Sequence, residues 1–125
     1  MAKRIFTSFA IEDERMRDLF VGQAKAKRVP YDLVDMSVKE PWRDSWKTRC
    51  RTKIKGCDGV VTLITTNLNQ AGGARWEIKC AKDEGIPVIG VYIGGATANN
   101  APAELNGIKK ITWTWDGIAS FVNSL

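Results

Sequence analysis

The carboxylate of Glu77, in the segment RWEI (75–78), stands where an ionised side chain could act on a ligand. It follows the pair Gly72-Gly73 and lies in the first turn of a helix expected over residues 75–84. Because a helix N-terminus favours negative charge, we expect Glu77 to be ionised at neutral pH. Such an anion suits a developing cation or the hydroxyls of a sugar. The residues alone leave a second interpretation open, in which this glutamate only complements the helix dipole.

Several other chemistries are excluded by residue types that the sequence lacks. There is no histidine, which rules out Ser-His-Asp and Cys-His catalysis. The three cysteines are scattered without a CxxC pair, so we expect reduced thiols and no metal site. Neither GxGxxG after the first predicted strand nor a P-loop is present. A receiver domain would end its third strand on an aspartate, where Thr65 and Thr66 stand instead.

Hydrophobic patterning predicts that residues 1–125 form one domain in which strands and helices alternate. The strands are expected at residues 3–9, 31–35, 58–65, 87–93 and 110–113, and the helices at 12–27, 45–55, 75–84 and 117–125. This alternation is typical of an α/β fold with a parallel sheet. Five strands at this length favour a flavodoxin-like three-layer fold, with strand order 2-1-3-4-5 and helices on both faces.

Ligands of such sheets bind beyond the carboxyl ends of the strands. Four segments should therefore converge on the site, namely residues 8–13, 35–46, 66–77 and 94–100. Glu77 belongs to the third of them. The glycine pair before it fits either a loop that moves to admit a ligand or a plain turn.

The net charge is +5, and the excess is concentrated between Arg43 and Lys55, where six basic residues accompany one acidic residue. This pattern is typical of a solvated helix face, and it also fits an acidic protein partner. No DNA- or RNA-binding motif accompanies it, so nucleic acid is not the partner we expect. Without a membrane-length apolar run or a secretory signal at the start, we expect no membrane partner and a cytoplasmic location.

Five stretches of the sequence resemble the TIR-like family that includes the small TIR proteins of bacterial Thoeris anti-phage defence. They are RIFTSF, DMSVKEPW, VVTLIT, GGARWEIKCA and GIPVIGVYI, and together they span roughly residues 3–93. The stretch RWEIKCAKDEGIPVIGV is the most specific of the matching residues. The sequence departs from receptor TIR domains in lacking their Arg-Asp…Pro-Gly loop signature and the Phe-Trp motif of their last helix.

The resemblance implies that the chain cleaves NAD at the nicotinamide–ribose bond, with NAD as substrate and no permanently bound cofactor. In this family a glutamate early in the helix after the third strand is catalytic, and Glu77 matches it. The same comparison implies nucleotide-binding roles for five residues of the first two loops, Ser8, Phe9, Asp35, Ser37 and Trp42.

The resemblance also has implications for partners. Thoeris members make a cyclic ADP-ribose isomer that activates a downstream effector, and many TIR domains must self-associate to be active. The alternative is a non-catalytic TIR-like interaction module that uses the basic helix.

Overall fold

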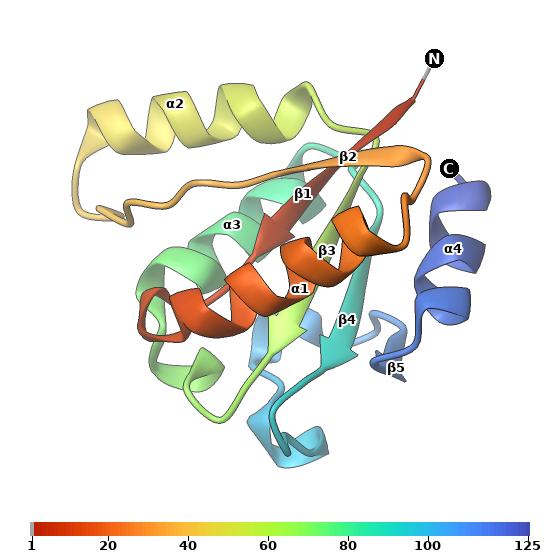
Figure 1. Cartoon of the computed structure of the whole chain (residues 1–125). Coiled ribbons are helices and arrows are strands. Elements are labelled where there is room, and N and C mark those ends of the chain that lie inside the picture. The colour runs from red at the N-terminus through yellow and green to blue at the C-terminus, as the bar shows by residue number, and fades with distance from the viewer. Residues whose placement is uncertain (1) are drawn as a thin grey trace.

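Five short strands of apolar composition form a parallel sheet in the order β2-β1-β3-β4-β5 (Figure 1). The structure is a computed structural model and describes residues 2–125. The strands are β1 (Lys3–Ser8), β2 (Tyr31–Val34), β3 (Gly59–Ile64), β4 (Val88–Tyr92) and β5 (Lys110–Thr112). The predicted flavodoxin-like strand order is confirmed, and each strand is one to two residues shorter than expected.

Four helices cover the two faces of the sheet. They are α1 (Glu14–Ala26), α2 (Asp44–Lys55), α3 (Gly72–Asp83) and α4 (Trp115–Asn123). Side chains alternate along the strands, so that Ile5 packs with residues of α1 and α4 while its neighbour Phe6 packs with residues of α2 and α3. The result is three layers, as the sequence predicted. Across the described residues, no helix has the length and apolar character needed to cross a bilayer.

The spacing of the buried residues in α2 is that of one face of a helix. Trp46, Cys50 and Ile54 recur every fourth position and are fully buried against the sheet. The basic residues fall on the other sides of this helix, where Arg49 and Lys55 are exposed. The predicted solvated basic face is therefore present.

Helix α3 begins three residues earlier than predicted. Gly72 and Gly73 form its first turn and are not part of the preceding loop. Gly73 also permits a close approach between two segments, because a Cβ at this position would lie only 2.8 Å from Cβ of Lys39. The glycine thus allows the loop after β2 to lie directly on the start of α3.

The carboxyl ends of β1 and β3 meet beside the start of α3. Ser8, the last residue of β1, pairs in register with Thr62 of β3. The loop of residues 35–43, which joins β2 to α2 and is called the β2–α2 loop below, runs over the same edge (Figure 1). This edge therefore places three of the four segments that the sequence analysis assigned to the site next to one another, namely those that begin at residues 8, 35 and 66.

Candidate functional site

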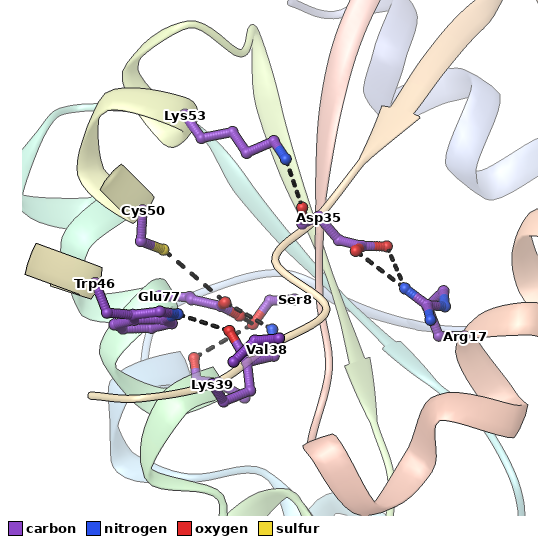
Figure 2. A network of polar contacts seen from close by, with 10 residues as sticks. Ser8, Arg17, Asp35, Val38, Lys39, Trp46, Cys50, Lys53 and Glu77 are labelled. Atoms are coloured by element: carbon purple, nitrogen blue, oxygen red, sulfur yellow. Dashed lines mark hydrogen bonds and ion pairs between the residues drawn. The ribbon is translucent and has the colours of Figure 1, made fainter. Parts of the chain in front are cut away.

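Glu77 lies inside the protein at the carboxyl edge of the sheet. Its side chain is 0% exposed. The Ser8 hydroxyl donates a hydrogen bond to Oε1 at 3.0 Å, and the Lys39 ammonium donates to Oε2 at 2.7 Å. The thiol of Cys50 lies 3.9 Å from Oε2. Figure 2 shows these side chains converging on the carboxylate from β1, the β2–α2 loop and α2.

The surroundings of Glu77 oppose its ionisation. Burial raises the pKa of Glu77 to about 7, although the Lys39 ammonium and the Ser8 hydroxyl both act to lower that pKa. The sequence-based expectation of an ionised carboxylate therefore depends here on the ion pair with Lys39. The carboxyl group is poised to titrate near neutrality.

The position of Glu77 in its helix differs from the prediction. The sequence predicts Glu77 in the first turn of the helix, but α3 begins at Gly72, so Glu77 lies in its second turn. The field of a helix N-terminus fades within the first turn, so it gives this carboxylate little support. The negative charge depends instead on Lys39, which comes from a segment 38 residues away in the chain.

The Lys39 ammonium is held on two sides. It lies 2.7 Å from Glu77 Oε2 and 4.2 Å from the centre of the Phe9 ring, and its side chain is only 4% exposed. Arg17 lies over the same ring, with Cζ 4.9 Å from the centre. A cation is therefore bound between a carboxylate and an aromatic ring, an arrangement in which both partners attract positive charge.

Three further contacts fix the β2–α2 loop over the site (Figure 2). Arg17 donates two hydrogen bonds to the Asp35 carboxylate, at 2.9 and 3.0 Å. Lys53 donates to the Asp35 carbonyl at 2.8 Å, and the Trp46 indole donates to the Val38 carbonyl at 2.6 Å. The loop is thus anchored at Asp35 and at Val38, the residue directly before Lys39.

A cavity of about 320 Å³ opens beside this ion pair. Its walls are mainly apolar, and they come from the β2–α2 loop, from the segment after β1 and from the start of α3; the lining residues are Ile11, Glu12, Lys39, Pro41, Trp42, Gln70, Ala71, Gly72, Gly73 and Ala74. Lys39 belongs both to this wall and to the ion pair with Glu77. Trp42 stands at the rim, 73% exposed. Glu77 itself does not line the cavity.

The structure brings together some of the predicted binding residues. Ser8 contacts Glu77, and Phe9 contacts Lys39, although Phe9 is fully buried in the core. Trp42 lines the cavity beside the ion pair. These three residues share one region with the carboxylate, and their nucleotide-binding roles stay predictions.

Asp35 and Ser37 lie elsewhere. The Asp35 carboxylate is engaged by Arg17 and lines a separate cavity of about 460 Å³ between α1 and β2. Ser37 is exposed on the β2–α2 loop and does not line the cavity next to Glu77. Neither residue reaches the carboxylate in this arrangement of the loop.

Sequence reasoning missed Lys39 and Arg17. A lysine in a polar loop carries no local signal of burial, because most such side chains are solvated. For Arg17, the sequence indicated only that it lies on the first predicted helix, with no sign that it would contact the site. A weak signal was available in Glu77 itself. A buried glutamate requires a cationic or hydrogen-bonding partner, so a lysine or arginine was to be expected among the segments of the site.

Metal ligands do not gather at this site. Within residues 2–125, no group of three or more His, Cys, Asp or Glu side chains is placed to hold a metal ion, and the three cysteines are buried and free. The arrangement offers one carboxylate, one hydroxyl and an aromatic face around a bound cation. Its chemistry is therefore electrostatic: it can bind and stabilise positive charge.

Comparisons with known proteins agree with this topology. Residues 6–98 match the family described as Thoeris protein ThsB, TIR-like domain. No curated protein sequence matches the chain. A de novo designed Rossmann 2x3 fold protein, solved by NMR, is similar at 14% identity with a TM-score of 0.58, covering 99% of this chain and 91% of that chain. A prokaryotic SEFIR domain is similar at 14% identity and a TM-score of 0.53, covering 98% of this chain and 89% of that chain. At these identities the two structures support the fold alone.

Proposed function

This chain belongs to the family of Thoeris ThsB TIR-like domains, and from that premise we propose that it cleaves NAD at the nicotinamide–ribose bond. Glu77 is the catalytic carboxylate of this proposal. The observation that carries it is the cation held between Glu77 and Phe9, because the nicotinamide ring of NAD is itself a flat cation. A site built to surround positive charge beside a cavity suits that substrate.

The proposed reaction needs no acid at the leaving group. When the bond between ribose C1′ and the pyridinium nitrogen breaks, its electron pair goes to that nitrogen and nicotinamide leaves as a neutral molecule. The absence of histidine from the sequence is therefore compatible with the chemistry. Positive charge shifts to the ribose, which gains oxocarbenium character as in glycoside hydrolysis.

Glu77 would act on that developing charge. An ionised carboxylate next to the ribose stabilises the cation and accepts hydrogen bonds from ribose hydroxyls. The Ser8 hydroxyl, 3.0 Å from Oε1, holds the carboxylate in place for this role. Exclusion of water strengthens the interaction, because charges attract more strongly in a medium of low dielectric constant.

The attacking nucleophile decides the product. Water adds to C1′ and loses its proton to solvent, which gives ADP-ribose. A nucleophilic group of the same nucleotide gives a cyclic ADP-ribose-type product, which a downstream effector would recognise as the signal. Trp42, exposed at the rim of the cavity, is placed to stack on one of the two rings of the dinucleotide.

Self-association belongs to the same proposal. The ion pair between Lys39 and Glu77 separates the carboxylate from the cavity, so the isolated chain is in a resting arrangement. Contacts between copies that move the β2–α2 loop would open the site. We further propose a cytoplasmic location, where NAD is available to the chain.

Release of nicotinamide tests the proposal. The purified protein is incubated with NAD, with and without a crowding agent that promotes association, and nicotinamide is measured by chromatography. We expect release that falls by about a hundredfold or more in Glu77→Gln. Glu84→Gln is the matched control, because Glu84 pairs with Arg51 at the far end of α3. Equal release by wild type and Glu77→Gln would contradict the assigned role.

A non-catalytic interaction module is the second candidate. The observation in its favour is the exposed basic surface of α2, which includes Arg49 and Lys55 and fits an acidic protein surface. Absence of nicotinamide release under every condition above would favour this function. Charge reversal at Arg49 and Lys55 would then weaken partner binding without changing the free energy of unfolding.

A further inference from the structure

The place of Lys39 in the structure is unusual for a loop lysine. Its side chain is almost completely buried, and its ammonium lies between the Glu77 carboxylate and the Phe9 ring. Lysine side chains are rarely buried to this extent unless they are paired. The protein therefore fills an anionic, aromatic-walled position with a cation of its own.

The occupied position has the features of a binding site for an organic cation. One wall is the carboxylate, which is 0% exposed, and another is the face of an aromatic ring. The cavity of about 320 Å³ borders on Lys39 and supplies room for the rest of a ligand. A flat cationic ring could replace the ammonium and keep both interactions.

A neutral ligand could not make the same exchange. If it displaced Lys39, the buried carboxylate would lose the positive charge that compensates it, at a cost that buried unpaired charges always carry. A neutral ring could take this position only if Glu77 were protonated, since the carboxyl group would then carry no charge. The exchange of one cation for another leaves the charge of the site unchanged.

We propose that Lys39 is an internal stand-in for the cationic ring of the substrate, which closes the site at rest and competes with that ring for the Glu77 carboxylate. This inference rests on the proposed function and names its regulation. It makes the Glu77 carboxylate the source of the preference for an oxidised, cationic pyridinium over a neutral ring, and it makes Lys39 the group that such a cation must displace.

The glycine at the start of α3 provides an independent way to displace Lys39. A Cβ at Gly73 would lie 2.8 Å from Lys39 Cβ, which is too close, so Gly73→Ala should push the lysine away from α3. Gly22 in α1 is the control, since nothing lies within 4 Å of a Cβ at that position. Both substitutions add one methyl group to a helix, and Gly22 does not line the cavity beside Glu77.

Binding of 1-methylnicotinamide, a cation, and of neutral nicotinamide tests the proposal by titration calorimetry at pH 8.5. The proteins compared are wild type, Lys39→Met, Gly73→Ala and Gly22→Ala. We expect Lys39→Met and Gly73→Ala to bind the cation at least about tenfold more tightly than wild type, a change of 1.4 kcal/mol. Gly22→Ala should bind the cation as wild type does, and the affinity for neutral nicotinamide should change much less in all variants. Circular dichroism confirms that each variant is folded.

Two results would overturn the inference. One is equal affinity for 1-methylnicotinamide in wild type, Lys39→Met and Gly73→Ala. The other is an equal gain for the cation and for neutral nicotinamide. A gain for the cation in a protein that never cleaves NAD would keep this inference and remove the proposed function. Cleavage of NAD by wild type with unchanged binding in the variants would do the reverse.

Discussion

The ammonium of Lys39 lies 2.7 Å from Oε2 of Glu77, and the two residues form an ion pair that is almost wholly buried. This contact joins the β2–α2 loop to α3 across the carboxyl edge of the sheet. It compensates the charge of Glu77 and at the same time keeps Glu77 apart from the neighbouring cavity. This one pair of side chains therefore affects the stability of the protein, its pH dependence and access to the site.

Folding stability should depend on pH through Glu77. Its pKa is about 7 in the folded protein against 4.5 for an ordinary glutamate, so the folded state binds the proton more tightly than the unfolded chain. Protonation of Glu77 therefore increases the free energy of unfolding. This contribution is complete below pH 4.5 and is lost as the pH rises through 7. Lys39 and Asp35 are the charged groups that act on this carboxyl group, and the Cys50 thiol lies 3.9 Å from its Oε2.

The comparison with Glu77→Gln isolates this contribution, because glutamine cannot titrate. Chemical denaturation should show the stability of wild type, relative to Glu77→Gln, falling by about 2 kcal/mol between pH 5 and pH 8. A difference that does not change over this range would mean that Glu77 titrates at its ordinary pKa.

Ser8→Ala should reduce nicotinamide release more at pH 7 than at pH 9. Loss of the 3.0 Å hydrogen bond to Oε1 removes a group that lowers the pKa of Glu77, so a smaller fraction of the carboxylate is ionised at neutral pH. We expect a loss of about tenfold at pH 7 and partial recovery at high pH. The pH profile of the initial rate is the measurement. Thr7→Val is the control, because the hydroxyl of Thr7 is buried without a hydrogen-bond partner; a matching shift in that variant would contradict the prediction.

Trp42→Ala should weaken NAD binding and leave folding intact. The Trp42 side chain is 73% exposed, so its removal should change the free energy of unfolding by no more than about 0.5 kcal/mol. Loss of stacking should raise KM about tenfold with little change in kcat. Trp46→Ala provides the contrast, because Trp46 is fully buried and its truncation should cost about 3 to 5 kcal/mol. An unchanged KM in Trp42→Ala would remove this residue from the binding site.

Arg17 and Asp35 should be energetically coupled. Their side chains are each 16% exposed and share two hydrogen bonds, which is a favourable geometry for an ion pair. A double-mutant cycle with Arg17→Met and Asp35→Asn, followed by denaturation, should give a coupling energy of about 1 kcal/mol. The exposed pair of Arg43 and Glu40, in the same loop, should give much less. A coupling equal to that of the exposed pair would show that Arg17 does not anchor the loop.

Local patterning in the sequence was enough to predict the architecture. Continuous apolar runs such as 59–64 read as buried strands, and the spacing of Trp46, Cys50 and Ile54 read as one face of a helix. These signals come from residues close together in the chain, whose periodicity reports directly on burial. Glu77, Ser8 and Phe9 could be placed together because parallel strands direct their carboxyl ends to the same edge.

The state of the carboxylate was decided only by the tertiary structure. Ionisation of Glu77 depends on its burial and on Lys39, and neither follows from the residues next to it in the sequence. The close approach at Gly73 was likewise not predictable, since it involves Lys39 from a distant segment of the chain. Local sequence reports which face of an element is buried, but desolvation and charge pairing depend on which distant side chains the fold brings together.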